Sequence, residues 1–470
     1  LHFSLRRQRQ MCIRDSRMVS FTGDKALMYK ANFCLRTAIR ILKPIKHFTA
    51  KTADEVYDAV KAIAWEEYLD NMSSFAVDAV VFSNEFRHSK FVAYKVKDAI
   101  VDYFREKTGN RPSVRISNPD LAINIHIAED QCTLSLDSSG ESLHRRGYRQ
   151  EQVEAPLNEV LAAGMILMTG WRGECDLIDP MCGSGTIPIE AALIARNIAP
   201  GIFRKEFGFE KWKDFDQNLL DSIYNDDSQE REFTHKIYGY DNNPRANEIA
   251  THNVKAAGVS KDVILKIQPF QQFEQPKEKS IIITNPPYGE RISSGDLLEL
   301  YKMIGERLKH AFTGNDAWIL SYRDECFDQI GLKASVKIPL FNGALECQFR
   351  QYQLFDGKYK AFRSENAGKD FKPRRNTDSP RPKTRSFSRD GERKEGFRKE
   401  EGFRGRKAGD GKEFTRERRN EFRFKDESKP RTPRPSTDDG RPKQAPGPRY
   451  MHSRRKPEIE RENNESMDEQ

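Results

Sequence analysis

The chain has 470 residues, which is enough for two or three domains and excludes a single small disulfide-stabilised module. Its seven cysteines form no CxxC pair, and no apolar run reaches the roughly 18 residues of a membrane span, which favours a reduced, cytoplasmic protein without a membrane anchor. The excess of positive charge is local. Residues 361–470 hold 32 Lys and Arg against 22 Asp and Glu, whereas residues 1–360 hold 48 against 49.

Both ends of the chain are expected to lack a stable fold. Residues 1–17 show neither a helical nor a strand period and resemble translated library-adapter sequence, so we interpret them as a non-native or disordered segment. A basic arm for nucleic acid is the alternative interpretation. Residues 361–470 contain one branched aliphatic residue, Ile459, and cannot bury enough apolar surface to offset the entropy of ordering, which predicts a disordered Arg/Lys-rich tail.

The pattern of apolar residues predicts a small α+β domain over residues 51–150. A helix over 26–42, which Pro44 ends, precedes it. Within the domain, helical spacing alternates with strand-like runs: helices are expected over 53–69 and 90–107, and strands over 75–82, 121–126 and 131–136.

Residues 151–360 predict a larger α/β domain. A helix with apolar residues from Leu157 to Met168 opens it, and short strands then alternate with helices; strands are expected over 176–178, 236–240, 263–267, 280–284, 317–321, 336–339 and 346–354. Strands separated by helices form a parallel sheet, and the turn signal Asn342-Gly343 joins the last two strands into an antiparallel hairpin. The expected fold is a mostly parallel, doubly wound sheet with a closing hairpin.

Residues 197–235 interrupt this alternation with an aromatic-rich insertion. The segment is too apolar for a linker, so we expect it to be ordered and to pack on the domain. A helical cover is one interpretation, and substrate contact through Phe209 or Trp212 is the other.

The segment Asp179–Glu190 follows the first strand of the larger domain and opens a helix. Glycines at 183 and 185 allow a tight turn and the close approach of a ligand, and the first amides of the helix can bind a negative group. Pro188 breaks the GxGxxG dinucleotide pattern, and no GK[ST] is present for a phosphate loop. The turn therefore favours a nucleotide-like ligand without a pyrophosphate.

Two further strands end in polar residues. Asp241 lies at the end of the second strand, where a carboxylate can accept hydrogen bonds from ribose hydroxyls; a helix cap is the alternative role. After the fourth strand, Pro286 and Pro287 fix a stiff turn that presents the Asn285 amide and the Pro286 carbonyl as acceptors and Tyr288 as a flat face. This arrangement suits a planar base with an exocyclic amino group, and a purely structural turn is the alternative.

Three segments, DPMCGSGT at 179–186, YGYDNNP at 238–244 and NPPYGER at 285–291, resemble motifs of class I S-adenosylmethionine-dependent methyltransferases that act on amino groups of nucleobases. The upstream segments DSSGESLHRRGYR at 137–149 and APLNE at 155–159 extend the resemblance to the THUMP-domain family of bacterial large-subunit (23S) ribosomal RNA guanine-N2 methyltransferases. The resemblance covers about residues 19–355. It implies a Rossmann-like methyltransferase domain over 151–360, a THUMP-type RNA-binding domain over 51–150, and the remnant of an N-terminal ferredoxin-like subdomain in residues 18–50.

The resemblance also implies S-adenosylmethionine as cofactor and assigns roles to residues of this chain. Asp241 would bind the ribose, and Gln268, in place of an acidic residue common in class I enzymes, would meet the adenine amino group, with Phe270 packed on the adenine. The cradle for the rest of the cofactor would be Asp179, Pro180, Cys182, Gly183, Ser184, Gly185 and Thr186. The target base would be held by Asn285, Pro286, Pro287 and Tyr288.

The chemistry needs little beyond alignment, because a sulfonium methyl group is already electrophilic. Asn285 and the Pro286 carbonyl can neutralise the charge that develops on the attacking amine. We therefore expect no metal and no dedicated general base, and we interpret His144 and His252 as satisfied or surface histidines.

RNA is the expected partner, and basic residues of the smaller domain and of the following segment are candidate contacts. They are Arg87, Lys90, Arg115, His144, Arg145, Arg146, Tyr148 and Arg149. The tail, with aromatic residues among arginines, is expected to add RNA affinity without sequence preference. Methylation of transfer RNA at guanine N2, methylation of adenine N6, and a catalytically silent RNA-binding assembly factor are the alternatives.

Overall fold

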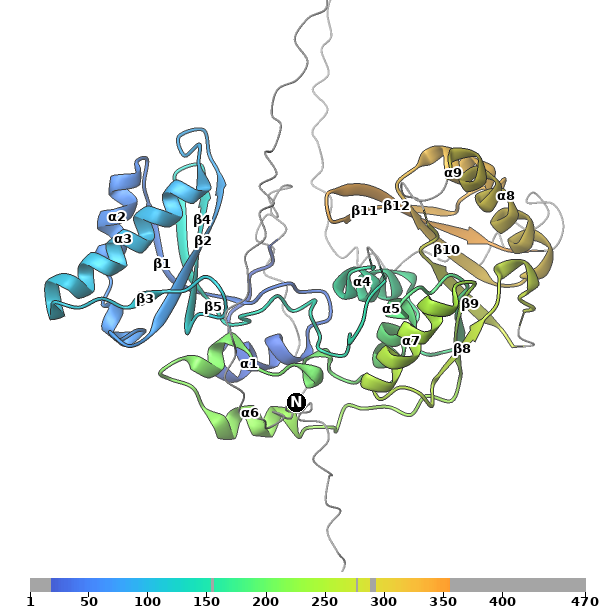
Figure 1. Cartoon of the computed structure of the whole chain (residues 1–470), viewed down its shortest axis with the longest axis horizontal. Helices are drawn as coiled ribbons and strands as arrows, with labels where there is room; N and C mark the ends of the chain where they lie inside the picture. Colours follow the sequence, from blue (N-terminus) through green and yellow to red (C-terminus); the bar gives the residue numbers. More distant parts are fainter. Residues whose placement is uncertain (1–17, 154–155, 276–277, 288–292, 356–470) are drawn as a thin grey trace, which may run out of the picture. The chain divides into compact units, whose positions relative to one another are not determined.

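The computed structural model describes residues 18–153, 156–275, 278–287 and 293–355, which form two β-sheets with their covering helices (Figure 1). The predictions of disorder for residues 1–17 and 361–470 lie outside the described residues. Every described cysteine is a free thiol. Among the described helices, none is both long and apolar enough to cross a membrane.

The first sheet has five strands in the order β1-β5-β4-β2-β3. In chain order they are β1 (Leu42–Thr49), β2 (Ser74–Phe82), β3 (Ser113–Val114), β4 (Leu121–Ala128) and β5 (Gln131–Asp137). On β4, alternate residues such as Ile123, Ile125 and Ile127 are buried, as the period of two in a strand requires. Helices α2 (Ala53–Lys61) and α3 (Ser89–Thr108) pack together on this sheet (Figure 1).

The helix predicted over 26–42 is wrong in its extent. Helix α1 (Lys25–Cys34) is shorter, and residues 42–49 form β1. Pro44 is compatible with this strand because β1 is an edge strand, paired with β5 alone, and its register shifts between Pro44 and Lys46. The helix predicted over 53–69 also ends early, and a 3-10 turn, η1 (Trp65–Glu67), follows α2.

The second sheet has seven strands in the order β11-β12-β10-β9-β6-β7-β8. In chain order they are β6 (Asp176–Asp179), β7 (Ile237–Asp241), β8 (Val263–Ile267), β9 (Ser280–Thr284), β10 (Asp316–Ser321), β11 (Val336–Asn342) and β12 (Leu345–Gln353). Strands β6 to β10 are mutually parallel, and β12 runs antiparallel to both β10 and β11. The predicted parallel sheet with an antiparallel closing hairpin is confirmed.

Helices cover both faces of the second sheet (Figure 1). Helices α4 (Glu159–Thr169), α5 (Thr186–Ala195) and α7 (Pro244–Ala256) lie on one face, and α8 (Ser294–Ala311) and α9 (Asp324–Gln329) on the other. On β9, Ile281 and Ile283 join the core of the first face, whereas Ile282 joins the core that contains α8. A strand that is buried on both sides reads as a continuous apolar run, which explains why β9 was predictable.

The aromatic insertion is ordered and packs on α1. It contains η2 (Pro200–Phe203), η3 (Gly208–Lys211) and α6 (Gln217–Tyr224). The rings of Tyr29 and Phe209 stack with centroids 4.0 Å apart. Phe209 and Trp212 are both buried, so the interpretation that they contact substrate is wrong and the covering role is the correct one.

Candidate active site

The polar residues that end β6, β7 and β9 meet at one edge of the second sheet. The three strands are parallel neighbours, with Asp179 opposite Gly239 and Ile178 opposite Ile282. Because parallel strands end on the same side, Asp179, Asp241 and Asn285 all lie at this carboxyl edge, where open α/β sheets bind ligands.

The glycine-rich turn between β6 and α5 lies against the end of β7. The backbone N–H of Cys182 donates to the Tyr240 carbonyl (2.8 Å), and the N–H of Gly183 donates to Oδ2 of Asp241 (3.0 Å). Gly185 has a φ of +81° and approaches α7 so closely that an added Cβ would lie 3.2 Å from the Cβ of Ala250. Within the turn, Pro180, Cys182, Ser184, Gly185 and Thr186 are buried and Gly183 is half-buried.

Asp179 connects the turn to the end of β9. Its Oδ1 accepts hydrogen bonds from the Thr284 hydroxyl (2.9 Å) and from the Met181 backbone N–H (3.3 Å). Burial, with a smaller contribution from the nearby carboxylate of Asp241, raises the pKa of Asp179 to about 7. A positive group bound beside Asp179 would favour its ionised form.

Asn285 follows β9 and offers an unused acceptor. Its Oδ1 is buried and has no hydrogen-bond partner in the described part of the chain. A buried oxygen without a partner costs about 1–3 kcal/mol, so this atom is free to accept a hydrogen bond from a ligand. Pro286 is buried and Pro287 exposed, while Tyr288, predicted to stack on the base, lies outside the described residues.

Gln268 and Phe270 follow β8 at the same edge. The backbone N–H of Gln268 donates to the Asp241 carbonyl (3.0 Å), and its side-chain Nε2 donates to the Gln272 carbonyl (2.8 Å). This bond leaves Oε1 as the group that would accept from an adenine amino group. Phe270 is 4% exposed and packs against Phe312, which leaves little of the ring for a ligand, so its contact with adenine stays a prediction.

The structure corrects the prediction that Arg146 and Tyr148 contact RNA. Both side chains are buried, and both contact Glu190 of α5: the Nε of Arg146 lies 3.4 Å from Oε1 of Glu190, and the Tyr148 hydroxyl donates to the same oxygen (3.0 Å). Burial raises the pKa of Glu190, which Arg146 opposes. A buried carboxylate needs such partners, and the side chains of Arg146 and Tyr148 are therefore unavailable to RNA.

Arg149 holds the glycine-rich turn. Its guanidinium donates to the hydroxyls of Ser184 and Thr186 (2.9 Å each) and to Oε1 of Glu159 (2.8 Å). Its side chain is 14% exposed, so the prediction that it contacts RNA is replaced by a positioning role. Sequence reasoning missed Asn253, a buried residue of α7 whose Nδ2 donates to the Ser184 carbonyl (3.1 Å). A polar residue on the apolar face of a helix was the available signal.

The other candidate RNA contacts lie on the surface, in separate places. Arg87 and Lys90 are exposed at the start of α3, whereas Arg115 is exposed beyond β3, beside the first residues of β2. Since α3 has 20 residues, it separates these positions by roughly 30 Å. Arg145 is exposed and pairs with Glu141 (2.7 Å). The Nδ1 of His144 is hydrogen-bonded to the hydroxyl of Ser142 (2.8 Å), and burial lowers the pKa of this histidine.

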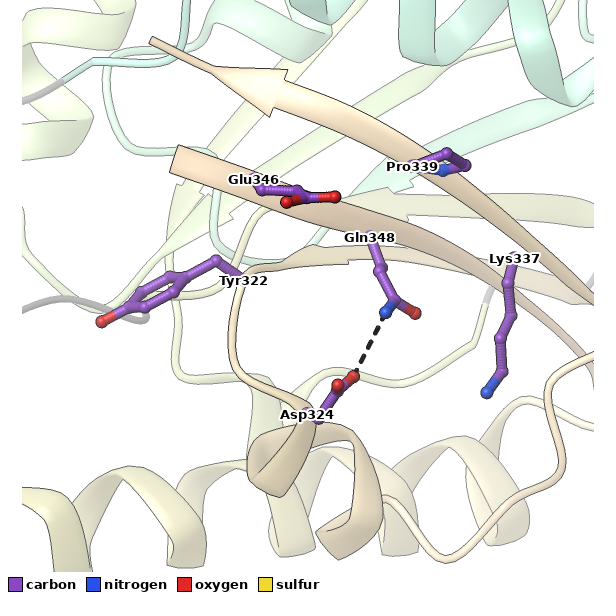
Figure 2. A pocket seen from close by; sticks show the side chains of 6 residues that line it. All are labelled: Tyr322, Asp324, Lys337, Pro339, Glu346 and Gln348. Atoms are coloured by element: carbon purple, nitrogen blue, oxygen red, sulfur yellow. Dashed lines mark hydrogen bonds between the residues drawn. The ribbon is translucent and has the colours of Figure 1, made fainter. Parts of the chain in front are cut away.

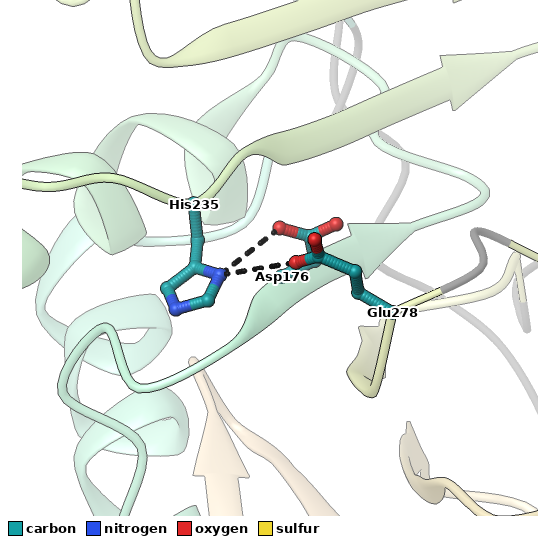
Figure 3. A group of neighbouring side chains, drawn as sticks. All are labelled: Asp176, His235 and Glu278. Atoms are coloured by element: carbon teal, nitrogen blue, oxygen red, sulfur yellow. Dashed lines mark ion pairs between the residues drawn. The ribbon is translucent and has the colours of Figure 1, made fainter.

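A second polar cluster lies at the opposite, amino edge of the sheet. Figure 3 shows His235 directed at Asp176 and Glu278, with Nδ1 at 3.6 Å and 3.7 Å from their carboxylate oxygens. The three donor atoms lie within 4.8 Å of one another, a chemistry that suits a cation, although the sequence analysis names no metal ligand. Because Asp176 also accepts from the Lys236 backbone N–H (2.8 Å), the cluster ties together the segments that lead into β6, β7 and β9.

A doubly wound sheet with an acid-bearing, glycine-rich turn after its first strand is the architecture of a Rossmann-like methyltransferase. The profile of the RMKL-like methyltransferase domain matches residues 146–351, that of the THUMP domain matches 50–137, and that of the RlmL ferredoxin-like domain matches 12–42. The "Putative RNA methyltransferase slr0064" of Synechocystis is 38% identical over 340 residues, covering 72% of this chain and 88% of that protein. The chain therefore belongs to the THUMP-containing RMKL-like methyltransferase family, as its motifs predicted.

Two further comparisons agree with this membership. The "Ribosomal RNA large subunit methyltransferase K/L" of Syntrophotalea carbinolica is 40% identical over 354 residues, covering 72% of this chain and 50% of that protein. The chain thus spans about half the length of the K/L relatives it matches. The crystal structure of "SMU.472, a putative methyltransferase complexed with SAH" superposes with a TM-score of 0.63 at 32% identity, covering 72% of this chain and 89% of that one.

Proposed function

We propose that this protein transfers a methyl group from S-adenosylmethionine to the exocyclic N2 amino group of a guanine in RNA, with large-subunit (23S) ribosomal RNA as substrate. The observation that carries the proposal is the buried, unpartnered Oδ1 of Asn285 beside a turn built for a nucleotide-like ligand. The Thr284–Asp179 hydrogen bond joins the two halves of this site. The names of the K/L relatives support the choice of RNA.

The residues at the carboxyl edge fit S-adenosylmethionine, which supplies the methyl group when bound. Asp179 would face the ammonium of the methionine part, the turn through Gly183 and Gly185 would admit its carboxylate, and Asp241 would accept from the ribose hydroxyls. The half-buried Gln268 would accept from the adenine amino group through Oε1. The relative solved with SAH supports this choice of cofactor.

Asn285 would act on the target guanine by orientation. Its Oδ1 and the Pro286 carbonyl accept the two N–H bonds of the amino group, which turns the nitrogen lone pair toward the methyl group. As the amine becomes positively charged during transfer, the same acceptors stabilise that charge. The proton can then leave to solvent, so no general base is needed.

RNA would also be held outside the reacting centre. Arg87 and Lys90 are exposed neighbours and can contact phosphates, and Arg145 is the exposed basic residue of the Leu143–Arg149 segment. The basic tail, 361–470, would add nonspecific affinity; deleting it should weaken RNA binding and reduce the salt dependence. Because ribosomal RNA is the substrate, we infer activity in the cytoplasm.

The test uses the full chain and RNA from cells that lack its gene. The protein is incubated with isotope-labelled S-adenosylmethionine and with either ribosomal or transfer RNA, and the labelled nucleoside is identified by mass spectrometry and mapped. Labelled N2-methylguanine in large-subunit RNA supports the proposal, with the Asn285→Ala variant as the control that should give none. Label in transfer RNA would show that transfer RNA is the substrate, and label in N6-methyladenine would show that adenine is the methylated base. No label in any RNA, together with intact RNA binding, would favour the assembly factor.

A further inference from the structure

A pocket of about 530 Å³ lies at the carboxyl edge of the second sheet, between the closing hairpin and α9 (Figure 2). This volume falls within the roughly 300–1,000 Å³ of ligand-binding pockets. Figure 2 shows side chains of the two hairpin strands along one side and Asp324 facing them from the start of α9. The lining residues are Tyr322, Asp324, Lys337, Pro339, Glu346 and Gln348.

The pocket lies at the same height in the sheet as the segment that follows β9 and begins with Asn285. Thr284, which precedes Asn285, is paired with Ile319 of β10, and Ser321 of β10 is paired with Gln348 of β12. Adjacent strands are about 4.8 Å apart, so Gln348 lies two strands, roughly 10 Å, across the sheet from β9. A group bound in the pocket would therefore be a near neighbour of the base held by Asn285.

One part of the pocket is rigid and internally satisfied. Gln348 donates through Nε2 to Asp324 (3.3 Å) and accepts from Nε of Arg350 (2.9 Å). Arg350 also pairs with Asp324, and its guanidinium lies over the ring of Phe327. These contacts join β12 to α9 and fix the floor of the pocket.

Two opposite charges line the open side of the pocket. Glu346 and Lys337 are both exposed, and over the described residues neither has a hydrogen-bond or ion-pair partner for its side chain. Glu346 is paired in the sheet with Phe341, four residues along β11 from Lys337. At about 3.4 Å per residue their backbones are roughly 14 Å apart along the strand, a distance that two long side chains can shorten to the span between a base edge and its phosphate.

We propose that this pocket binds one nucleotide of the RNA next to the target guanine, with guanine as the preferred base. Glu346 accepts from the base, because guanine presents two adjacent N–H donors that match the two oxygens of a carboxylate, and Lys337 pairs with a phosphate. Tyr322 forms a wall beside the base. The inference rests on the proposed function and adds to it a site that selects the sequence around the methylated position.

The first experiment measures methylation kinetics on large-subunit RNA. Glu346→Gln and Lys337→Met should each raise the KM for RNA about tenfold while kcat and the affinity for S-adenosylmethionine stay unchanged. Glu299→Gln and Lys302→Met are the matched controls, because they make the same charge changes at exposed positions of α8 and should leave the KM unchanged. Equal effects of controls and pocket variants would overturn the proposal, as would a changed cofactor affinity in the pocket variants.

The second experiment replaces, one at a time, the bases that flank the mapped guanine. For the wild-type protein one replacement should raise the KM about tenfold, and in Glu346→Gln the same replacement should add no further loss, since both changes remove one contact. If, at every flanking base, the increase in KM from the base replacement multiplies with the increase from Glu346→Gln, the proposed site would be refuted. If the wild-type protein methylates no guanine N2 in any RNA, the proposed function fails and this inference with it; normal methylation without the coupling refutes the pocket alone.

Discussion

The carboxyl edge of the seven-stranded sheet and the segment Leu143–Arg149 are both dense in polar residues, but their hydrogen-bonding groups are used differently. At the edge, the Oδ1 of Asn285 is buried and unpartnered. In the segment, Arg146 and Tyr148 both contact Oε1 of the buried carboxylate of Glu190, whose Oε2 has no partner among the described residues, and Arg149 donates to the hydroxyl of Ser184.

The comparison teaches that residue type alone does not identify a binding surface. Arginine and tyrosine recur in RNA-binding surfaces, yet here Arg146 and Tyr148 contact the buried carboxylate of Glu190, and Arg149 bonds to the glycine-rich turn. An unsatisfied acceptor points to a ligand when it also lies at the carboxyl edge of a parallel sheet, as Oδ1 of Asn285 does and Oε2 of Glu190, within helix α5, does not. Four predictions test this distinction, from the largest effect to the smallest.

Replacing Asn285 should have the largest effect. Asn285→Ala removes the acceptor that orients the amino group, and we expect methylation to fall by about 10³-fold, in line with the loss of one stabilising group at a reacting centre. The affinity for S-adenosylmethionine, measured by calorimetry, should be unchanged, since the Oδ1 of Asn285 makes no hydrogen bond to the glycine-rich turn. Near-normal turnover would refute the assignment of the target-base site.

Arg149 and Arg145 should differ sharply in their effect on stability. Arg149→Ala leaves Glu159 buried without its partner, so the free energy of unfolding should fall by about 3 kcal/mol, and the cofactor should bind less tightly. Arg145→Ala removes an exposed ion pair and should cost less than about 0.5 kcal/mol. Urea denaturation measures both, and similar losses would contradict the positioning role of Arg149.

The pKa of Asp179 predicts a pH dependence of cofactor binding. With a pKa of about 7 in the free protein, Asp179 is mostly protonated at pH 6 and mostly ionised at pH 7.5. If it pairs with the ammonium of the methionine part, the affinity should rise roughly eightfold over that range. The stability of the free protein should change in the opposite direction, because a raised carboxyl pKa favours folding below it and this contribution is lost as the pH rises through about 7.

The control for Asp179 is the isosteric variant Asp179→Asn, which cannot ionise. Calorimetry over the same pH range should show weaker binding without the pH dependence, and thermal unfolding should show that the pH-dependent part of stability is reduced. A wild-type affinity that does not change between pH 6 and pH 7.5 would show that Asp179 does not meet a positive group.

The smallest effect is expected on the surface of the smaller domain. Arg87→Ala with Lys90→Ala should weaken RNA binding a few-fold and lower the slope of log K against log salt by about 2, since two phosphate contacts are lost. Arg115→Ala, roughly 30 Å away by the length of α3, tests whether RNA reaches the far end of this domain. Filter binding at several salt concentrations measures both, and an unchanged slope would remove Arg87 and Lys90 from the interface.

Local patterns were sufficient where a strand is buried on both faces or a turn has distinctive chemistry. Strand β9, which is buried along its whole length, matches the predicted range, and the Asn-Pro-Pro segment led directly to Asn285. Strand β1 was missed because its existence depends on pairing with β5, about 90 residues further along the chain. Pro44, which ends a helix in sequence terms, is tolerated at this edge.

The amino-acid sequence by itself determined the alternation of strands and helices that gives a parallel sheet, the glycine-rich turn and the position of Asn285, because apolar periodicity and turn residues act over a few neighbours. Only the tertiary structure decided which polar side chains are satisfied. The bonds from Arg149 to Ser184 and from Asn253 to the Ser184 carbonyl join residues 35 and 69 positions apart. The unused charges of Glu346 and Lys337 became visible in the same way, because the absence of a partner is a property of the folded chain.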